Sequence, residues 1–219
     1  MAIDKETLIL EVARKHFVQR GYAATRMQDI ADEAGANKAL LHYYYRSKEK
    51  LYHEITARIL DTIIPRFAQA LSIEGTFWQR VEAMVSSYIS LLQEQPDIPF
   101  FIMSEVSQKQ ERFIEELKKR SQYFPALQGF VMSMHQEMEA GNIRTIPPIH
   151  LMLNIMGMTV FPFLAKPFLT TVFGVADEDF SELMSERKDI ILSFLRTALK
   201  PGWFFLATSL LRKKKLCLL

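Results

Sequence analysis

Apolar residues recur at helical spacing in almost every segment of this chain, and this pattern decides its fold class. Between about residues 5 and 20, for example, Ile9, Val12, Ala13 and Phe17 fall on one face of a helix. We find no run of alternating apolar and polar residues bounded by the Asn-Gly or Asp-Gly turns that mark a hairpin. The sequence therefore predicts an all-α protein.

Residues that begin and end helices divide the amino-terminal region into short elements. Gly21 is expected to end the first helix, because glycine readily adopts the left-handed conformation found after helix ends. Thr25 and Gln28 have the spacing of a reciprocal capping box at the start of a second helix. Gly35 then permits a tight turn before a third short helix, over about residues 38–44.

Further signals place the later helices. Asn37 and Ser47 are good amino-terminal caps for the third helix and for a longer fourth one, which Pro65 should kink or end. Thr76 and Gln79 form another capping-box pattern. The remaining helices are expected over about residues 77–95, 100–107, 123–140, 148–165 and 178–199, with a solvated helix or loop at 109–120 and a loop at 170–176.

Composition excludes several other classes of protein. The chain has 219 residues, of which 49% are hydrophobic and 24% charged, as in an ordinary globular protein of one large or two small domains. Cys217 is the single cysteine, so neither an internal disulfide nor a cysteine-based zinc site is expected, and no metal or cofactor is predicted. The first eleven residues have no apolar run suited to a secretory signal, and a cytoplasmic location is expected.

The net charge becomes informative when it is divided along the chain. There are 27 Lys and Arg residues against 25 Asp and Glu, a net charge of +2. Residues 1–60 hold ten bases and eight acids, residues 61–199 twelve and seventeen, and residues 200–219 five and none. This asymmetry suggests that an end of the chain meets a polyanion while the acidic middle has another task.

The second and third helices and the turn between them form a helix-turn-helix pattern. The second helix of such a motif can enter the major groove of DNA, which is about 12 Å wide. Its exposed face should then carry hydrogen-bond donors, and no Asp or Glu occurs in residues 37–48, whose net charge is +3. The residues expected on or next to this face are Lys38, His42, Tyr43, Tyr44, Arg46 and Lys48.

An ordered set of short motifs runs through the same region. These motifs are Phe17 with Gly21-Tyr22, Thr25 with Ile30-Ala31 and Ala34-Gly35, and Leu41-His42-Tyr43-Tyr44-Tyr45 followed by Ser47-Lys48-Glu49 and Leu51. With them, residues 9–51 resemble the DNA-binding domain of the tetracycline-repressor-like (TetR/AcrR) family of bacterial transcriptional regulators. The set covers about a fifth of the chain and is highly specific as a set.

The resemblance implies a domain organisation and a mode of action. It implies a helix-turn-helix domain over residues 1–47 and a ligand-binding and dimerisation domain over residues 48–200, with a helix at about 48–70 connecting them. Such regulators are homodimers, usually repressors, that bind a palindromic DNA operator and release it when a small molecule enters the second domain. The last two main helices would form the dimer interface, and the two reading helices would stand about 34 to 36 Å apart.

The resemblance also assigns residues to the DNA contact. His42 stands where the family most often has Tyr, and Leu40 where a small or hydroxyl residue is common. Leu40 cannot form a side-chain hydrogen bond, so specificity there must come from apolar contact, for instance with a thymine methyl group. The positions facing base edges are Lys38, Ala39, Leu40 and Tyr43, and those facing phosphates are Thr25, Arg26, Asn37, His42, Tyr44 and Lys48.

Some of these positions have a structural alternative. Tyr45 is interpreted as an aromatic core residue. Lys48 either binds a phosphate or is a solvated lysine at a helix start. Arg26 and Gln28 either contact DNA or only cap the second helix.

Met and Phe concentrate between residues 77 and 194, which suits both an irregular core and an adaptable apolar pocket. Polar residues inside apolar helices are more informative, because a buried polar group needs a partner. Glu105 would suit a cationic ligand if buried, or would be an exposed helix carboxylate. The residues predicted to bind an unknown small apolar effector are Tyr88, Phe101, Glu105, Phe130, Met134, His150, Asn154 and Phe161.

The segment 201–219 lies beyond the resemblance. Its apolar residues 203–211 and basic residues 212–215 fit a segment packed on its own protein, a membrane-surface anchor, or a basic arm or artificial addition. Stable membrane association is not expected, because nine or ten apolar residues are too few to span a bilayer.

The predicted function is therefore ligand-responsive regulation of transcription, and two other functional classes compete with it. An enzyme with a DNA-binding head is disfavoured, since the chain has no nucleophile elbow, glycine-rich phosphate loop or metal-binding helix motif. A non-specific architectural DNA-binding protein is the main alternative, and would show salt-dependent binding without operator preference.

Overall fold

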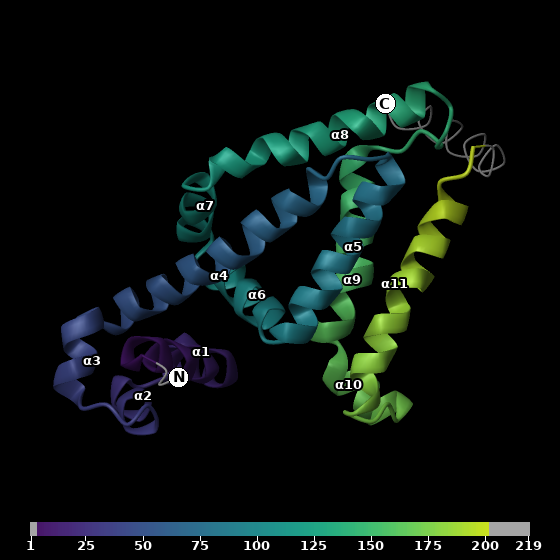
Figure 1. The fold of residues 1–219 in the computed structure, drawn as a ribbon. Helices are drawn as coiled ribbons and strands as arrows, with labels where there is room; N and C mark the ends of the chain where they lie inside the picture. Colours follow the sequence, from purple (N-terminus) through teal and green to yellow (C-terminus); the bar gives the residue numbers. More distant parts are fainter. Residues whose placement is uncertain (1–3, 202–219) are drawn as a thin grey trace, which may run out of the picture. The chain divides into compact units, whose positions relative to one another are not determined.

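A computed structural model describes residues 4–201 of the chain (Figure 1). Over this range it contains eleven α-helices, one short 3-10 turn and no strand, which confirms the all-α prediction. The elements are α1 (Lys5–Ala24), α2 (Met27–Glu33), α3 (Lys38–Tyr45), α4 (Lys48–Leu71), α5 (Phe77–Glu94), α6 (Ile98–Gln108), α7 (Gln110–Lys118), the 3-10 turn η1 (Ser121–Tyr123), α8 (Phe124–Glu139), α9 (Pro148–Leu164), α10 (Lys166–Phe173) and α11 (Asp179–Ala198).

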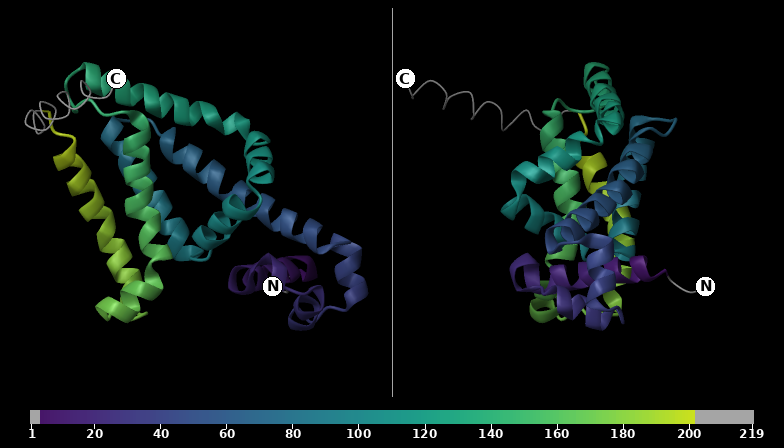
Figure 2. Two further views of the ribbon diagram at one scale, coloured as in Figure 1. Left: turned by 180° about the vertical axis from the view of Figure 1, so that it is seen from behind. Right: turned by 90° about the vertical axis from the view of Figure 1, so that its left-hand side faces the viewer.

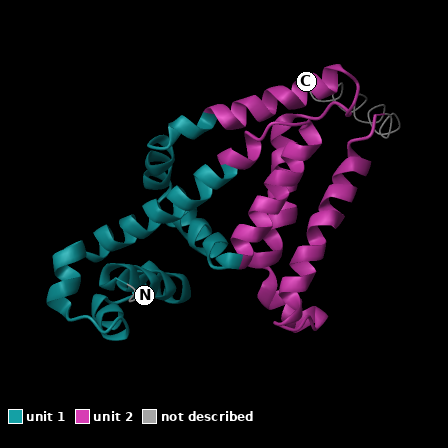
Figure 3. Cartoon of the chain, in the orientation of Figure 1, with its two compact units in different colours: residues 1–67, 94–124 teal, residues 68–93, 125–219 magenta. Residues whose placement is uncertain are grey.

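The described chain divides into two compact units (Figure 3). The first unit combines residues 4–67 with residues 94–124, and the second combines residues 68–93 with residues 125–201. The first unit thus holds the three helices predicted for residues 1–47 together with most of α4, with α6 and with α7. The functional boundaries at residues 47 and 200 stay predictions. Apart from Pro201, the tail predicted for residues 201–219 lies outside the described residues.

The core of the first unit is built from one face of each helix. Ile9 of α1, Ile30 of α2 and Leu41 of α3 are almost completely buried. The Tyr52 ring of α4 lies against the Phe101 ring of α6, with 5.2 Å between their centroids. Apolar residues at helical spacing therefore meet as the sequence pattern predicts, and each large side chain contributes about 1.5–3 kcal/mol by its burial.

Local backbone signals fix three boundaries in this unit. Gly21 has φ 73° and ψ 168°, so the regular part of α1 ends there, as predicted. The Asn37 side chain accepts a hydrogen bond of 2.7 Å from the amide of Leu40 at the start of α3. The Ser47 hydroxyl accepts one of 3.1 Å from the amide of Lys50 at the start of α4. Both predicted caps are confirmed.

The capping box predicted at Thr25 and Gln28 is wrong. The Thr25 hydroxyl lies 3.1 Å from the carbonyl oxygen of His16 and 2.8 Å from that of Gly21, so it donates to α1 instead of capping α2. Gln28 donates to the side chain of Asp32. Thr25 is only 1% exposed, and the tertiary packing of α1 on α2 decides its orientation.

Pro65 neither ends α4 nor separates it into two helices, because α4 continues to Leu71. Proline removes one backbone hydrogen bond of the helix. The residues beyond it, Ala68, Ala70 and Leu71, are all buried, and this burial offsets the loss.

Two further segments differ from their predictions. The charged stretch at residues 109–120 is mostly the helix α7, and it is not fully solvated, because Glu116 and Arg120 are buried. The loop predicted at residues 170–176 is helical up to Phe173, in α10, before Gly174 ends that helix at φ 68°. Pro167 occupies the first turn of α10, where proline favours a helix start.

The second unit has its own apolar core. Phe77 of α5 stacks on Phe130 of α8, with 5.7 Å between ring centroids and 17° between ring planes. The helices α9 and α11 run side by side (Figures 1 and 2), and Arg187 of α11 donates to the carbonyl oxygen of Met158 in α9 at 2.8 Å. Within residues 4–201 no single helix is long and apolar enough to cross a membrane, although α9 and α10 reach that length and composition together, with a bend of 65° between them.

Candidate nucleic-acid interface

The helix α3 separates its side chains into a buried and an exposed set. Leu41 and Tyr45, four residues apart, are 1% and 6% exposed and point into the first unit. Tyr43 is 79% exposed, and its ring meets the edge of the Tyr44 ring at 5.5 Å between centroids. Because Asn37 caps the first turn, the exposed side chains project from a helix whose start is held in place.

The ion pairs of the first unit leave this exposed face positive. Asp29 and Glu33 of α2 are both paired with bases of α1: Arg20 lies 3.0 Å from Asp29, and Lys15 lies 2.8 Å from Glu33. Hydrogen bonds from Lys15 and then from His16 lower the pKa of Glu33. Three bases on or beside α3 form no ion pair with any residue of the described part of the chain, and they are Arg26, Lys38 and Arg46.

Lys48 lies at the first residue of α4. Its ammonium nitrogen donates a hydrogen bond of 3.2 Å to the carbonyl oxygen of Ala23 and lies 4.5 Å from the centroid of the Tyr22 ring. Burial and the nearby charge of Lys109 lower the pKa of Lys48. These contacts hold the lysine between the end of α1 and the start of α4.

Most of the predicted DNA-contacting residues are accessible. Thr25 is the exception, because its side chain is buried and its hydroxyl is bound to α1. The Asn37 side chain is exposed but accepts the capping hydrogen bond, and Leu40 and Lys48 are half-buried. Tyr45 is buried, in agreement with its interpretation as a core residue. The exposed members of the set without a capping role are Arg26, Lys38, Ala39, His42, Tyr43 and Tyr44.

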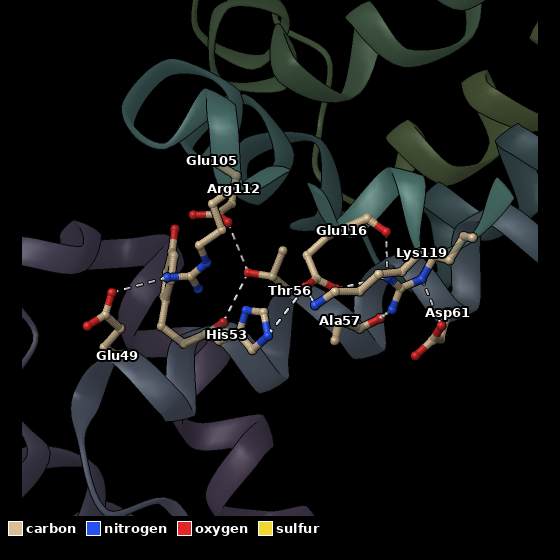
Figure 4. A network of polar contacts seen from close by, with 11 residues as sticks. Glu49, His53, Thr56, Ala57, Asp61, Glu105, Arg112, Glu116 and Lys119 are labelled. Atoms are coloured by element: carbon tan, nitrogen blue, oxygen red, sulfur yellow. Dashed lines mark hydrogen bonds and ion pairs between the residues drawn. The ribbon is translucent and has the colours of Figure 1, made fainter. Parts of the chain in front are cut away.

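Two of the predicted effector-binding residues, Phe101 and Glu105, belong to α6 in the first unit, and both are buried. Glu105 is 0% exposed, so the alternative of an exposed helix carboxylate is wrong. One oxygen of Glu105 accepts a hydrogen bond of 3.1 Å from Thr56 (Figure 4), and the other has no hydrogen-bond partner among the described residues. Burial, followed by the charge of Glu105, raises the pKa of Tyr52.

Tyr88, Phe130 and Met134 lie toward the interior of the second unit. Phe130 and Met134 of α8 are 0% exposed. Tyr88 of α5 is half-buried, and burial raises its pKa to about 12. These positions fit a core as well as the wall of a pocket, so their role in binding an effector stays a prediction.

The other three predicted effector-binding residues lie on α9 and face outward. His150 and Asn154 were expected inside an apolar helix, but both are exposed, because the buried face of α9 is the one with Leu151 and Ile155. Phe161 is 64% exposed. It lines a groove of about 270 Å³ in the second unit, whose other lining residues include Pro162, Ala165, Leu169, Leu183, Met184, Arg187 and Ile190.

Sequence reasoning missed a buried polar cluster in the first unit. Arg120 donates to both an oxygen of the Glu116 side chain, at 2.9 Å, and the carbonyl oxygen of Ala57, at 2.9 Å. Figure 4 labels Glu116 and Ala57. The i, i+4 spacing of Glu116 and Arg120 was the available signal. It could not separate a buried pair from a solvated one. No group of three or more His, Cys, Asp or Glu residues within 4–201 is placed to hold a metal ion.

Comparison with known proteins gives a family match for the first unit. Residues 9–55 match the family model of bacterial regulatory proteins, tetR family. This range contains α2, α3 and the start of α4, together with most of α1. The match therefore covers the helix-turn-helix and the residues that carry the sequence resemblance.

Curated relatives share the same region. The chain is 32% identical over 124 residues to YhgD, an uncharacterized HTH-type transcriptional regulator of Bacillus subtilis, with 52% of this chain and 65% of that protein covered. It is 29% identical over 118 residues to the HTH-type transcriptional repressor KstR2 of Mycolicibacterium smegmatis, with 48% and 58% covered. The matched parts thus span less than two thirds of the length of these relatives.

Solved structures share the fold over most of the chain. The ketosteroid transcriptional regulator KstR2 of Mycobacterium tuberculosis matches with a TM-score of 0.66 at 19% identity, covering 88% of this chain and 95% of that one. The transcriptional regulator FadR of Bacillus subtilis, solved with stearoyl-CoA, matches with a TM-score of 0.59 at 17% identity, covering 86% and 98%. Residues 9–55, which hold the helix-turn-helix, are therefore a DNA-binding region of the tetR family of bacterial regulatory proteins, and the chain as a whole shares the all-helical fold of these solved regulators.

Proposed function

We propose that this protein is a ligand-responsive regulator of transcription that binds a palindromic DNA operator as a homodimer and acts as a repressor. The observation that carries the proposal is the exposed face of α3, where bases and tyrosines project and where residues 37–48 contain no Asp or Glu. Such a face offers donors to phosphates and base edges, while its apolar surface suits thymine methyl groups. The pairing of Asp29 and Glu33 with α1 keeps two acids of α2 from opposing DNA.

The proposed effector is a small apolar molecule. Support comes from relatives: the KstR2 structure is described as that of a ketosteroid regulator, and FadR was solved with stearoyl-CoA. A ketosteroid and the stearoyl chain of stearoyl-CoA are both apolar groups. The second unit of this chain has a core rich in Phe and Met, and Met side chains adapt readily to apolar ligands. A ligand would release DNA by favouring a dimer whose two reading helices no longer match the operator.

Homodimer formation is supported by apolar side chains left exposed on α9, α10 and α11. Monomeric proteins rarely expose apolar patches of more than about a few hundred Å². On α11 the exposed Ile190 and Phe194 are four residues apart, so they lie on one face of the helix. Ile149 and Leu153 have the same spacing on α9. The side chains concerned are Ile149, Leu153, Met156 and Phe161 of α9, Phe168, Val172 and Phe173 of α10, and Ile190 and Phe194 of α11.

DNA binding is tested with the purified chain and the DNA upstream of its own gene. Tyr43→Ala should lower specific affinity by about 1–3 kcal/mol and leave binding to unrelated duplex nearly unchanged, because Tyr43 faces base edges. Lys48→Ala should weaken binding to both duplexes and reduce the slope of log K against log salt by about 1, because it removes one phosphate contact. Fluorescence anisotropy over a salt series measures both quantities.

Lys118→Ala is the matched control, because Lys118 is an exposed lysine of α7 without an ion pair in the described chain. It should leave both affinities unchanged. Wild-type protein that binds its upstream DNA no better than a scrambled duplex would contradict operator recognition. If such binding kept a steep salt dependence, it would favour the architectural alternative. A promoter-reporter assay separates repression from activation, a distinction that matters because one relative, FasR of Mycolicibacterium smegmatis, is named an activator.

The dimer is tested by Phe194→Glu. Phe194 is 61% exposed on α11, and a carboxylate there should raise the dimer dissociation constant by at least about tenfold, or about 1.4 kcal/mol. Sedimentation velocity over a concentration series measures the change. Met132→Glu is the control, since Met132 is equally exposed, at 64%, but lies on α8, outside the proposed interface. Equal effects of the two substitutions would argue against an interface on α9 and α11.

A further inference from the structure

Two lysines from distant parts of the sequence share one aromatic ring in the first unit. The Lys48 nitrogen lies 4.5 Å from the centroid of the Tyr22 ring, and the Lys109 nitrogen lies 4.1 Å from the same centroid. The two nitrogens are therefore at most 8.6 Å apart, the total of these distances. Lys109 lies between α6 and α7, and Lys48 is the first residue of α4. The Tyr22 ring thus brings the end of α6 close to the start of α4.

The Lys109 ammonium has no carboxylate partner. Within residues 4–201 it forms neither an ion pair nor a side-chain hydrogen bond, and its contacts are the rings of Tyr22 and, at 5.4 Å, Tyr52. A cation over a tyrosine ring gains about 0.5–1 kcal/mol at an exposed site. A phosphate would add a charge-assisted hydrogen bond to this contact. Lys109 is thus a half-buried cation whose ammonium group is held in place by two tyrosine rings.

The other charged groups around these rings do not neutralise the two lysines. Arg112 of α7 stands 5.7 Å from the Tyr52 ring and 3.6 Å from an oxygen of Glu49. Glu105 is buried and bound to Thr56. Three cations, Lys48, Lys109 and Arg112, are therefore opposed by two carboxylates. That of Glu49 is exposed and that of Glu105 is buried.

Two like charges this close repel each other in the absence of an anion. Burial and then the charge of Lys109 lower the pKa of Lys48, which is the expected sign of that repulsion. An anion placed between two ammonium groups converts the repulsion into two attractions. Lys48 is already predicted to face a DNA phosphate, so the anion that fits is a phosphate of the DNA backbone.

We propose that Lys109 is a second phosphate-binding residue, which joins Lys48 in contacting the DNA backbone through the junction of α6 and α7. The inference rests on the proposed function and adds to it a residue that lies outside the helix-turn-helix and outside the family match at residues 9–55. Tyr22 acts as the positioning residue for both lysines, because its ring holds each ammonium near the start of α4.

The test compares single variants of the full chain in duplex binding over a salt series. Lys109→Gln should reduce the slope of log K against log salt by about 0.9, the value for one phosphate contact, on operator and on unrelated duplex alike. Lys109→Arg keeps the charge and should retain the wild-type slope. Lys118→Gln removes one positive charge from the exposed surface of α7 and should also retain it.

The outcomes distinguish this inference from the proposed function. One outcome is a wild-type protein that prefers the operator while Lys109→Gln leaves the slope of log K against log salt unchanged. This result would overturn the phosphate contact of Lys109 but not the proposed function. Loss of slope in Lys118→Gln as well would also overturn it, because the effect would then come from net charge. Absence of any wild-type DNA binding would overturn both proposals. Thermal unfolding of Lys109→Gln near the wild-type midpoint shows that a change in slope does not come from loss of the fold.

Discussion

Replacement of Arg120 by methionine is expected to lower the free energy of unfolding by about 3–5 kcal/mol, the cost of removing one partner from a buried ion pair. Arg120 is 6% exposed and Glu116 is 2% exposed. The guanidinium group donates to the Glu116 carboxylate at 2.9 Å, to the carbonyl oxygen of Ala57 at 2.9 Å and to Asp61 at 2.8 Å. Methionine fills much of the same space but donates to none of these groups. Urea denaturation followed by circular dichroism measures the loss.

Lys119→Met provides the control for this prediction. Lys119 also pairs with Glu116, but its side chain is 61% exposed, so its loss should cost less than about 1 kcal/mol. Equal losses in the two variants would show that burial of Arg120 does not decide the strength of its ion pair. A loss below about 1 kcal/mol in Arg120→Met would contradict the buried cluster itself.

The same cluster has a pH signature. Burial alone would raise the pKa of Glu116, but hydrogen bonds from Lys119 and Arg120 outweigh it, and the pKa is lowered from its ordinary value of 4.5. A carboxylate with a lowered pKa in the folded state contributes stability that is present above about pH 4.5 and is lost as pH falls through the lowered value. Without Arg120, this acid-dependent loss of stability should be smaller.

Phe130→Ala is the second large effect, with an expected loss of about 3–5 kcal/mol. Phe130 is 0% exposed and stacks on Phe77 with 5.7 Å between ring centroids, so truncation removes buried apolar contacts and leaves a cavity. The measurement also tests the predicted role of Phe130 in binding an effector. A residue that lines an open pocket leaves less of a new cavity when truncated than a residue packed on all sides.

Met132→Ala is the matched substitution on the same helix. Met132 is 64% exposed, and its truncation should change stability by less than about 0.5 kcal/mol. A loss under about 1 kcal/mol in Phe130→Ala would contradict the packed core and favour a pocket at this position. Denaturation of both variants in guanidinium chloride, with unchanged m-values, makes the comparison direct.

Elements that depend on short-range chemistry were predictable from the sequence. Asn37 and Ser47 cap α3 and α4 because a side-chain oxygen reaches an amide three residues ahead, whatever the rest of the fold does. Gly21 ends the regular part of α1 for the same kind of local reason. The helix-turn-helix, and with it most of the candidate DNA interface, follows from such signals and from the spacing of apolar residues.

Elements that depend on distant packing were not predictable. Thr25 has a good alternative acceptor in the carbonyl oxygen of His16, and the sequence does not show that α1 brings it within reach. From the sequence alone, Glu116 and Arg120 are indistinguishable from a solvated pair. Their burial depends on the packing that brings the carbonyl oxygen of Ala57 next to Arg120. His150 points outward because another face of α9 is buried. The sequence of α9 is apolar on nearly all sides, so it does not show which face is buried.

In α3, the residues that hold the helix in place are different from the residues on its outer surface, and this separation has a consequence for evolution. Leu41, Tyr45 and the Asn37 cap hold the helix in place, whereas Lys38, Ala39 and Tyr43 lie on its outer surface and take no part in the core. Exposed positions of this kind usually tolerate exchange within about 0.5 kcal/mol of stability. Under the proposed function, mutation at these positions would change the preferred operator while the scaffold stays folded, so that target genes could be exchanged without a new protein architecture.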